Sequence, residues 1–98
     1  MFANHELIFA APRLYSALES TFPKEEGWRW DWLYANEIKV RIKYVSKEGV
    51  RHGLALELSA NNLDASQEIL EIYIREAIKA IRRQICAYAD RYPKQNAD

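Results

Sequence analysis

One unbroken apolar stripe at helical spacing occupies the last third of the chain, and no other feature constrains the fold as much. Its members are Leu70, Ile74, Ala77, Ile78, Ile81, Ile85, Tyr88 and Tyr92. The spacing predicts one amphipathic helix, capped by Asp64 with Gln67 in the capping-box position and ending near Arg91. Such a helix is roughly 40 Å long, whereas a domain of this size is about 33 Å across. We therefore expect part of the helix to overhang its domain, to bend around it, or to rest on a partner.

The hydrophobic period changes to two between Gly27 and Leu58. The apolar positions are Trp28, Trp30, Trp32 and Tyr34, then Ile38, Val40, Ile42 and Tyr44, and then Leu54, Leu56 and Leu58. Charged or small residues occupy most of the positions between them, which is typical of strands with one buried face. The breaks at residues 35–36 and 46–49 are short enough for hairpins, so an antiparallel meander is expected.

A shorter helical pattern precedes the strands. Leu7, Ala11, Leu14, Leu18 and Phe22 line one side of a helix. Pro12 has no N–H for the carbonyl of Ile8, so the helix kinks there or begins its regular part there. The sequence thus predicts an α+β fold in the order α-β-β-β-α, with two helices packed on one face of a three-stranded antiparallel sheet. We expect a single domain over residues 1–92 and a flexible polar tail over 93–98.

The composition limits the classes of function. The chain has 98 residues, and its 14 basic and 14 acidic side chains balance, so no overall charge attracts it to nucleic acid. No apolar run approaches the roughly 18 residues that span a bilayer, which predicts a soluble protein without membrane contact. A lone cysteine, Cys86, suits a reducing cytosol.

The search for catalytic and metal-binding motifs finds none. There is no Gly-rich phosphate loop, nucleophile elbow or Cys-x-x-Cys pair. His5 and His52 have no neighbouring ligands at metal spacing, and no histidine is near enough in sequence to activate Cys86. We expect neither an enzyme nor a metal ion or cofactor.

The string Trp28-Arg29-Trp30-Asp31-Trp32 allows two interpretations. Alternating aromatic rings can form a stacking platform for single-stranded nucleic acid, or they can fill the space between a sheet and its helices. The tryptophans share the apolar phase of the following two strands, and Tyr34 continues it. This shared phase favours a place in the core.

The opposite phase of the strands predicts a weakly basic sheet face. Arg29, Lys39, Arg41, Lys43 and Arg51 lie on it, against Asp31, Glu37 and Glu57. Such a face can simply be solvated and protect the sheet from aggregation, or it can bind an acidic partner or a phosphate backbone. We take its five basic residues as the candidate partner-binding site.

A second stripe on the long helix is the candidate self-association site. Ala65, Ile69, Ile72 and Glu76 lie apart from the core stripe, with Ile72 inside the charged arc. Scattered exposed apolar residues are harmless, but identical stripes can also pair across a two-fold axis. We expect a homodimer whose rim pairs Arg75, Lys79, Arg82 and Arg83 with Glu68 and Glu71 of the neighbour; in a monomer the stripe would face a foreign partner.

The element order also resembles that of the double-stranded-RNA-binding domain. That family binds phosphates with a lysine cluster at the start of its second helix, where this chain carries Asp64, Glu68 and Glu71. These carboxylates would repel phosphate. The comparison therefore argues against RNA binding of that kind.

The segment LIFAAPRLYSAL, Leu7 to Leu18, resembles a helical segment of many small bacteriophage and prophage proteins. The pattern there is roughly Leu-Ile-x-Ala-Ala-Pro-x-Leu-x-x-Ala-Leu, and here Phe9 and Tyr15 replace smaller residues. The resemblance implies a small phage accessory protein, similar in kind to anti-CRISPR proteins, that blocks a host factor by covering its surface. A host or phage protein is then the expected partner. The alternatives are a nucleic-acid-binding accessory protein that uses the basic sheet face and a self-assembling structural component of a phage.

Overall fold

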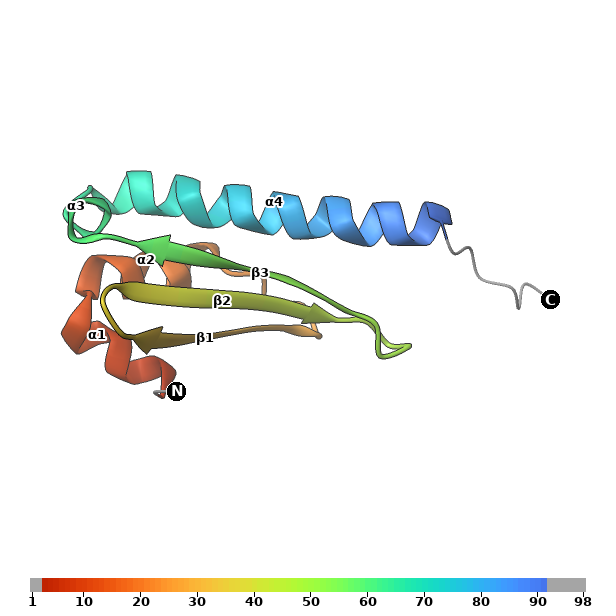
Figure 1. Cartoon of the computed structure of the whole chain (residues 1–98), viewed down its shortest axis with the longest axis horizontal. Coiled ribbons are helices and arrows are strands. Elements are labelled where there is room, and N and C mark those ends of the chain that lie inside the picture. Colours follow the sequence, from red (N-terminus) through yellow and green to blue (C-terminus); the bar gives the residue numbers. More distant parts are fainter. Residues whose placement is uncertain (1–2, 92–98) are drawn as a thin grey trace.

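The computed structural model describes residues 3–91 and has the predicted α+β architecture (Figure 1). The elements, in chain order, are the 3-10 turn η1 (Asn4–Glu6), α1 (Leu7–Ala10), α2 (Pro12–Thr21), β1 (Trp28–Tyr34), β2 (Ile38–Val45), β3 (Arg51–Leu58), α3 (Ala60–Leu63) and α4 (Gln67–Arg91). The predicted tail, residues 93–98, lies outside the described residues.

The three strands form the predicted antiparallel meander in the order β1-β2-β3. Trp30 is paired with Ile42, and Ile42 with Leu54, so the apolar phases of the strands coincide. Gly27 precedes β1 with a φ of 97°, and a Cβ there would lie 2.7 Å from the carbonyl oxygen of Val45. Only glycine fits this close approach of two backbones without distortion.

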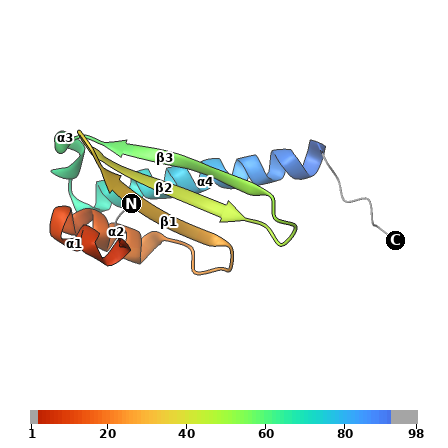
Figure 2. The same ribbon diagram turned by 60° about the horizontal axis from the view of Figure 1, so that its bottom comes forward.

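The helices gather on the apolar face of the sheet. α4 packs against α2 and also contacts β3 and β2, and Figure 2 shows it passing behind these two strands. The largest fully buried side chains come from α1, α2, β2 and α4: Leu7, Leu14, Leu18, Ile38, Val40, Ile42, Leu70, Ile74 and Ile81. The core is thus one layer between sheet and helices, and within residues 3–91 no helix covers the other sheet face.

The break that Pro12 predicts in the first helix is confirmed. Ala11 leaves the helical region at φ −152° and ψ 81°, and Pro12 opens the first turn of α2. Leu7, Ala11 and Leu14 on either side of the break are all buried. Part of the phage-like segment therefore serves the core of this fold, while its Ile8 and Phe9 are exposed.

The tryptophans lie mainly in the core. Trp28 and Trp32 are each 5% exposed, and the half-buried Trp30 meets Tyr15 edge-on at 6.4 Å between ring centroids. The indole N–H of Trp32 donates to the carbonyl oxygen of Ala3 at 2.9 Å. The prediction that Tyr34 continues this layer is wrong, because β1 is an edge strand that ends at this residue and leaves it 60% exposed.

The start of the long helix also differs from the prediction. Ser59 caps the short helix α3 in a capping box with Asn62, and Asp64 follows that helix at its C-terminal end. The hydroxyl of Ser66 then accepts from the backbone N–H of Ile69 at 3.3 Å, so α4 begins at Gln67. Asp64 is therefore not the cap, because serine residues nearer each helix start satisfy the free N–H groups.

The far end of α4 runs past its core contacts, as its length predicts. Ile81 is its last fully buried residue, Ile85 is half-buried, and every described residue from Cys86 to Arg91 is exposed. The helix lies along the whole sheet and reaches beyond it (Figure 1). Only its first four or five turns hold the fold together.

We predict that Trp32→Ala lowers the free energy of unfolding by about 3–5 kcal/mol, because it removes a large buried ring and leaves a cavity. Urea denaturation followed by far-ultraviolet circular dichroism measures the change. The matched control is Tyr34→Ala, two residues along the same strand, which should stay within about 0.5 kcal/mol of the parent protein. Equal effects of the two substitutions would show that Trp32 is not a core residue.

Candidate interaction surfaces

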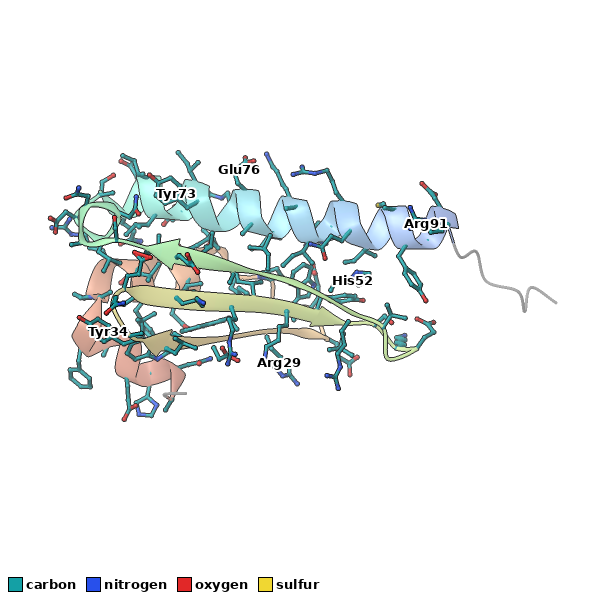
Figure 3. All side chains as sticks on the ribbon, in the orientation of Figure 1. Arg29, Tyr34, His52, Tyr73, Glu76 and Arg91 are labelled. Carbon is teal, nitrogen blue, oxygen red and sulfur yellow. The ribbon has the colours of Figure 1, made fainter. Side chains whose placement is uncertain are left out.

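The five predicted basic residues come together on the bare face of the sheet. They alternate along the strands with the buried residues, and the register places Arg29 opposite Lys43. Lys39 and Arg41 are half-buried, while Arg29, Lys43 and Arg51 are exposed. Arg29 extends from β1 away from α4 (Figure 3). We call these five residues and Asp31 and Glu57 the basic sheet face; Glu37, expected here too, lies in the turn between β1 and β2.

Asp31 is the organising residue of this face. It is only 7% exposed, and its two carboxylate oxygens accept from Arg41 Nε at 2.6 Å and from Lys43 Nζ at 2.9 Å. Burial raises the pKa of the Asp31 carboxyl, but the hydrogen bonds and charges of Arg41 and Lys43 outweigh it and hold the pKa below its usual 3.8. At neutral pH an ionised carboxylate therefore fixes two cations in place.

The charge balance of the face stays positive. Lys39 pairs with Glu57 at 3.3 Å, so three of the five cations are in ion pairs. Five basic groups against two acidic ones leave a surplus of three positive charges on a surface that is two strand spacings wide. Sequence reasoning counted Asp31 only as an opposing charge; its direct pairing with Arg41 across the strands follows from the hairpin register.

The second predicted site, on α4, is also at the surface. Ile69 is 43% and Ile72 52% exposed, and Glu76 is exposed one turn further along. Ala65 differs, because it precedes the helix and packs half-buried against the core. Tyr73, 37% exposed, belongs to the same surface although the stripe did not include it. We call Ile69, Ile72, Tyr73 and Glu76 the outer stripe.

A groove of about 510 Å³ lies beside the outer stripe, between α4 and β3. Its lining residues are Leu54, Leu56, Glu57, Leu58, Asn62, Tyr73, Glu76, Ala77 and Ala80. Figure 3 shows Tyr73 and Glu76 on the half of α4 that faces the end of β3. Sequence reasoning missed this groove, because Ala77 counts as an ordinary core position and only the packing shows that the two alanines leave a space.

Gln84 marks the limit of the groove towards the C-terminal end of α4. Its side-chain amide accepts from the backbone N–H of Gly53 and donates to the backbone carbonyl of Gly53, both at 3.2 Å. The amide therefore makes the two backbone hydrogen bonds that a neighbouring strand would make at this edge of β3. By the two-residue alternation of a strand, the backbone groups of Ala55 and Glu57 point to the same side, along the groove.

The candidate catalytic side chains remain apart. His5 is in η1, His52 in β3 and Cys86 on the exposed part of α4, and His52 contacts the ring of Tyr88 at 5.7 Å between centroids. Among residues 3–91, no group of three or more His, Cys, Asp or Glu side chains could hold a metal ion. Within the same range, no helix is long and apolar enough to cross a membrane.

Comparison with protein-family models, with curated proteins and with solved structures finds no match.

We predict that Asp31→Asn destabilises the protein by about 1.5–3 kcal/mol at pH 7, because Arg41 and Lys43 lose their charged hydrogen-bond partner. The folded-state pKa of Asp31 lies below its unfolded value, so its contribution is complete above that unfolded value and disappears as the pH falls through the folded one. Urea unfolding of both proteins between pH 7 and pH 2.5 should show a constant difference that narrows only below about pH 4. A difference that is already lost at pH 6 would contradict this role of Asp31.

Proposed function

We propose that the protein is a protein-binding module that covers a surface of its partner and carries out no chemistry on it. In this proposal it is a small phage-type accessory protein that inhibits or modulates a bacterial host factor, as anti-CRISPR proteins do. The phage-like segment at Leu7 to Leu18 supports the origin. The basic sheet face supports the mode of action.

The main support is the pairing of Asp31 with Arg41 and Lys43 on the bare sheet face, which we call the Asp31 clamp. A carboxylate that is only 7% exposed would destabilise the fold if its two cations were absent. The cations remain accessible, since 39% of the Arg41 side chain and 50% of the Lys43 side chain are exposed. Their positions are fixed before any partner arrives, so less conformational entropy is lost on binding than with free surface lysines.

The charge of the face favours one kind of partner. A surplus of three positive charges on a flat, rigid sheet is complementary to an acidic protein surface, and such complementarity raises the association rate and selects the partner. The same surplus is small for nucleic acid. Three phosphate contacts would give weak binding that salt readily abolishes.

The test reverses charges that the fold does not need. Arg41 and Lys43 are unsuitable, because a glutamate at either position would stand beside Asp31. Arg29 and Arg51 are exposed and outside the clamp, so Arg29→Glu with Arg51→Glu should leave the melting temperature within a few degrees. We predict that this double variant binds the partner at least tenfold more weakly.

The measurement starts from proteins that the wild type captures from bacterial lysate, identified by mass spectrometry, and continues with calorimetry on the purified protein. The control variant, Lys24→Glu with Arg91→Glu, makes the same change of charge away from the sheet and should bind as the wild type does. Unchanged affinity of the Arg29 and Arg51 variant would refute the sheet face as the binding site. Fluorescence anisotropy with a labelled oligonucleotide at 150 mM salt should show no binding; salt-resistant binding that the double variant abolishes would instead establish the nucleic-acid alternative.

A further inference from the structure

We propose that α4 pairs antiparallel with α4 of a second copy of this chain, about a two-fold axis between Ile72 and Tyr73, and that Ile69 of each chain fills the groove of the other. This inference concerns the edge of the molecule between α4 and β3, which shares only Glu57 with the basic sheet face. It stands or falls independently of the proposed function.

The helical wall of the groove has the spacing of a hole for a partner side chain. Tyr73, Glu76, Ala77 and Ala80 line it, and these positions follow the spacing i, i+3, i+4 and i+7. Four residues at this spacing form the hole that receives one side chain of a partner helix in knobs-into-holes packing. The two alanines keep the hole open, and Leu54 and Leu56 of β3 make its far wall apolar.

The knob that fits this hole lies on the same helix. Ile69 is the large aliphatic residue of the outer stripe one turn before Tyr73, and it is 43% exposed. Successive residues of a helix are 100° apart around its axis. Viewed down α4, the Ile69 side chain therefore points between the directions of Glu76 and Ala80. Knob and hole therefore face the same way, and a chain cannot insert its own knob into its own hole.

The spacing of knob and hole selects the register of the pair. Ile69 lies three to four residues before the point between Ile72 and Tyr73, and the centre of the hole lies three to four residues after it. A two-fold axis at that point brings each Ile69 over the partner's hole and each Ile72 beside the partner's Tyr73. A parallel pair would instead place Ile69 against Ile69 and leave both holes empty.

The charges beside the outer stripe fit the same register. Glu68 precedes the midpoint on one flank of α4, and Arg75 and Lys79 follow it on that flank. In the antiparallel pair Glu68 lies near the partner's Arg75 and Lys79, and this pairing occurs twice by symmetry. Within its own chain Arg75 contacts Glu71 at 3.4 Å and Lys79 contacts Glu76 at 3.3 Å, but 56% and 63% of these side chains are exposed and accessible to a second copy.

The first experiment measures mass by light scattering after size exclusion, at 5 to 200 µM and 150 mM salt. We expect a dimer whose dissociation constant rises at least about 30-fold in Ile69→Asp, the loss typical of a central anchor residue. Phe9→Asp is the matched control, because Phe9 is 84% exposed on α1, away from α4. It should leave the dimer intact, and both variants should keep the circular dichroism spectrum of the wild type. A monomeric wild type at 200 µM, or an unchanged dimer in Ile69→Asp, overturns the proposal.

A charge exchange tests the register and remains informative should Ile69→Asp unfold. Glu68→Arg and Arg75→Glu should each weaken the dimer, and the two together should restore it to within about threefold of the wild type. Failure of the double variant to restore the dimer, although it folds, refutes this antiparallel register. Binding of the partner to the basic sheet face, measured in the same variants, should be unaffected.

Discussion

The packing of α4 against the apolar face of the sheet determines which surfaces of the molecule stay free. A three-stranded sheet of this size cannot bury its apolar face alone, and α4 contributes the buried Leu70, Ile74 and Ile81 to the core on that face. Because α2 occupies the same face beside α4, the opposite sheet face stays bare. The position of the helix thus determines both surfaces that we consider functional: the basic sheet face and the groove along β3.

On the bare sheet face, polar interactions centred on Asp31 stabilise the strands. A buried carboxylate on the face of a sheet is destabilising unless cations neutralise it. The antiparallel register brings Arg41 directly opposite and Lys43 next to it, so the neutralising groups come from the neighbouring strand. The same interaction that stabilises the sheet holds two positive charges at its surface, where a partner can meet them.

The sequence predicts most of the fold because its two hydrophobic periods are clear. Alternation over 28–58 and the stripe over 70–92 determine the strands, the helix and their buried sides, and Pro12 determines the break in the first helix. The start of α4 was predicted wrongly, because Asp64 and Ser66 are both good N-cap residues and only the turn of α3 decides between them. The burial of Tyr34 was predicted wrongly for a different reason. Alternation shows on which side of the strand a residue lies, but not where the covering helices end.

The surfaces were predictable only in part. Alternation gives the five basic residues of the sheet face, and helical spacing gives Ile69 and Ile72. The groove depends on how far α4 stands from β3, which the sizes of Ala77, Ala80 and Leu56 fix together. The hydrogen bonds between the Gln84 amide and the Gly53 backbone join residues that are 31 positions apart. No local sequence pattern predicts them.

Distances between spin labels show whether α4 pairs with a second copy through its outer stripe. Single cysteines at Arg83, Ala87 and Arg91, in a Cys86→Ser background, place nitroxide labels at increasing distance from the proposed axis. In an antiparallel pair each residue of displacement separates the two labels by about 3 Å along the helices. Pulsed electron paramagnetic resonance should therefore give a distance that grows by about 12 Å with each step of four residues. Equal distances at the three sites, or no dipolar coupling between chains, would contradict the account.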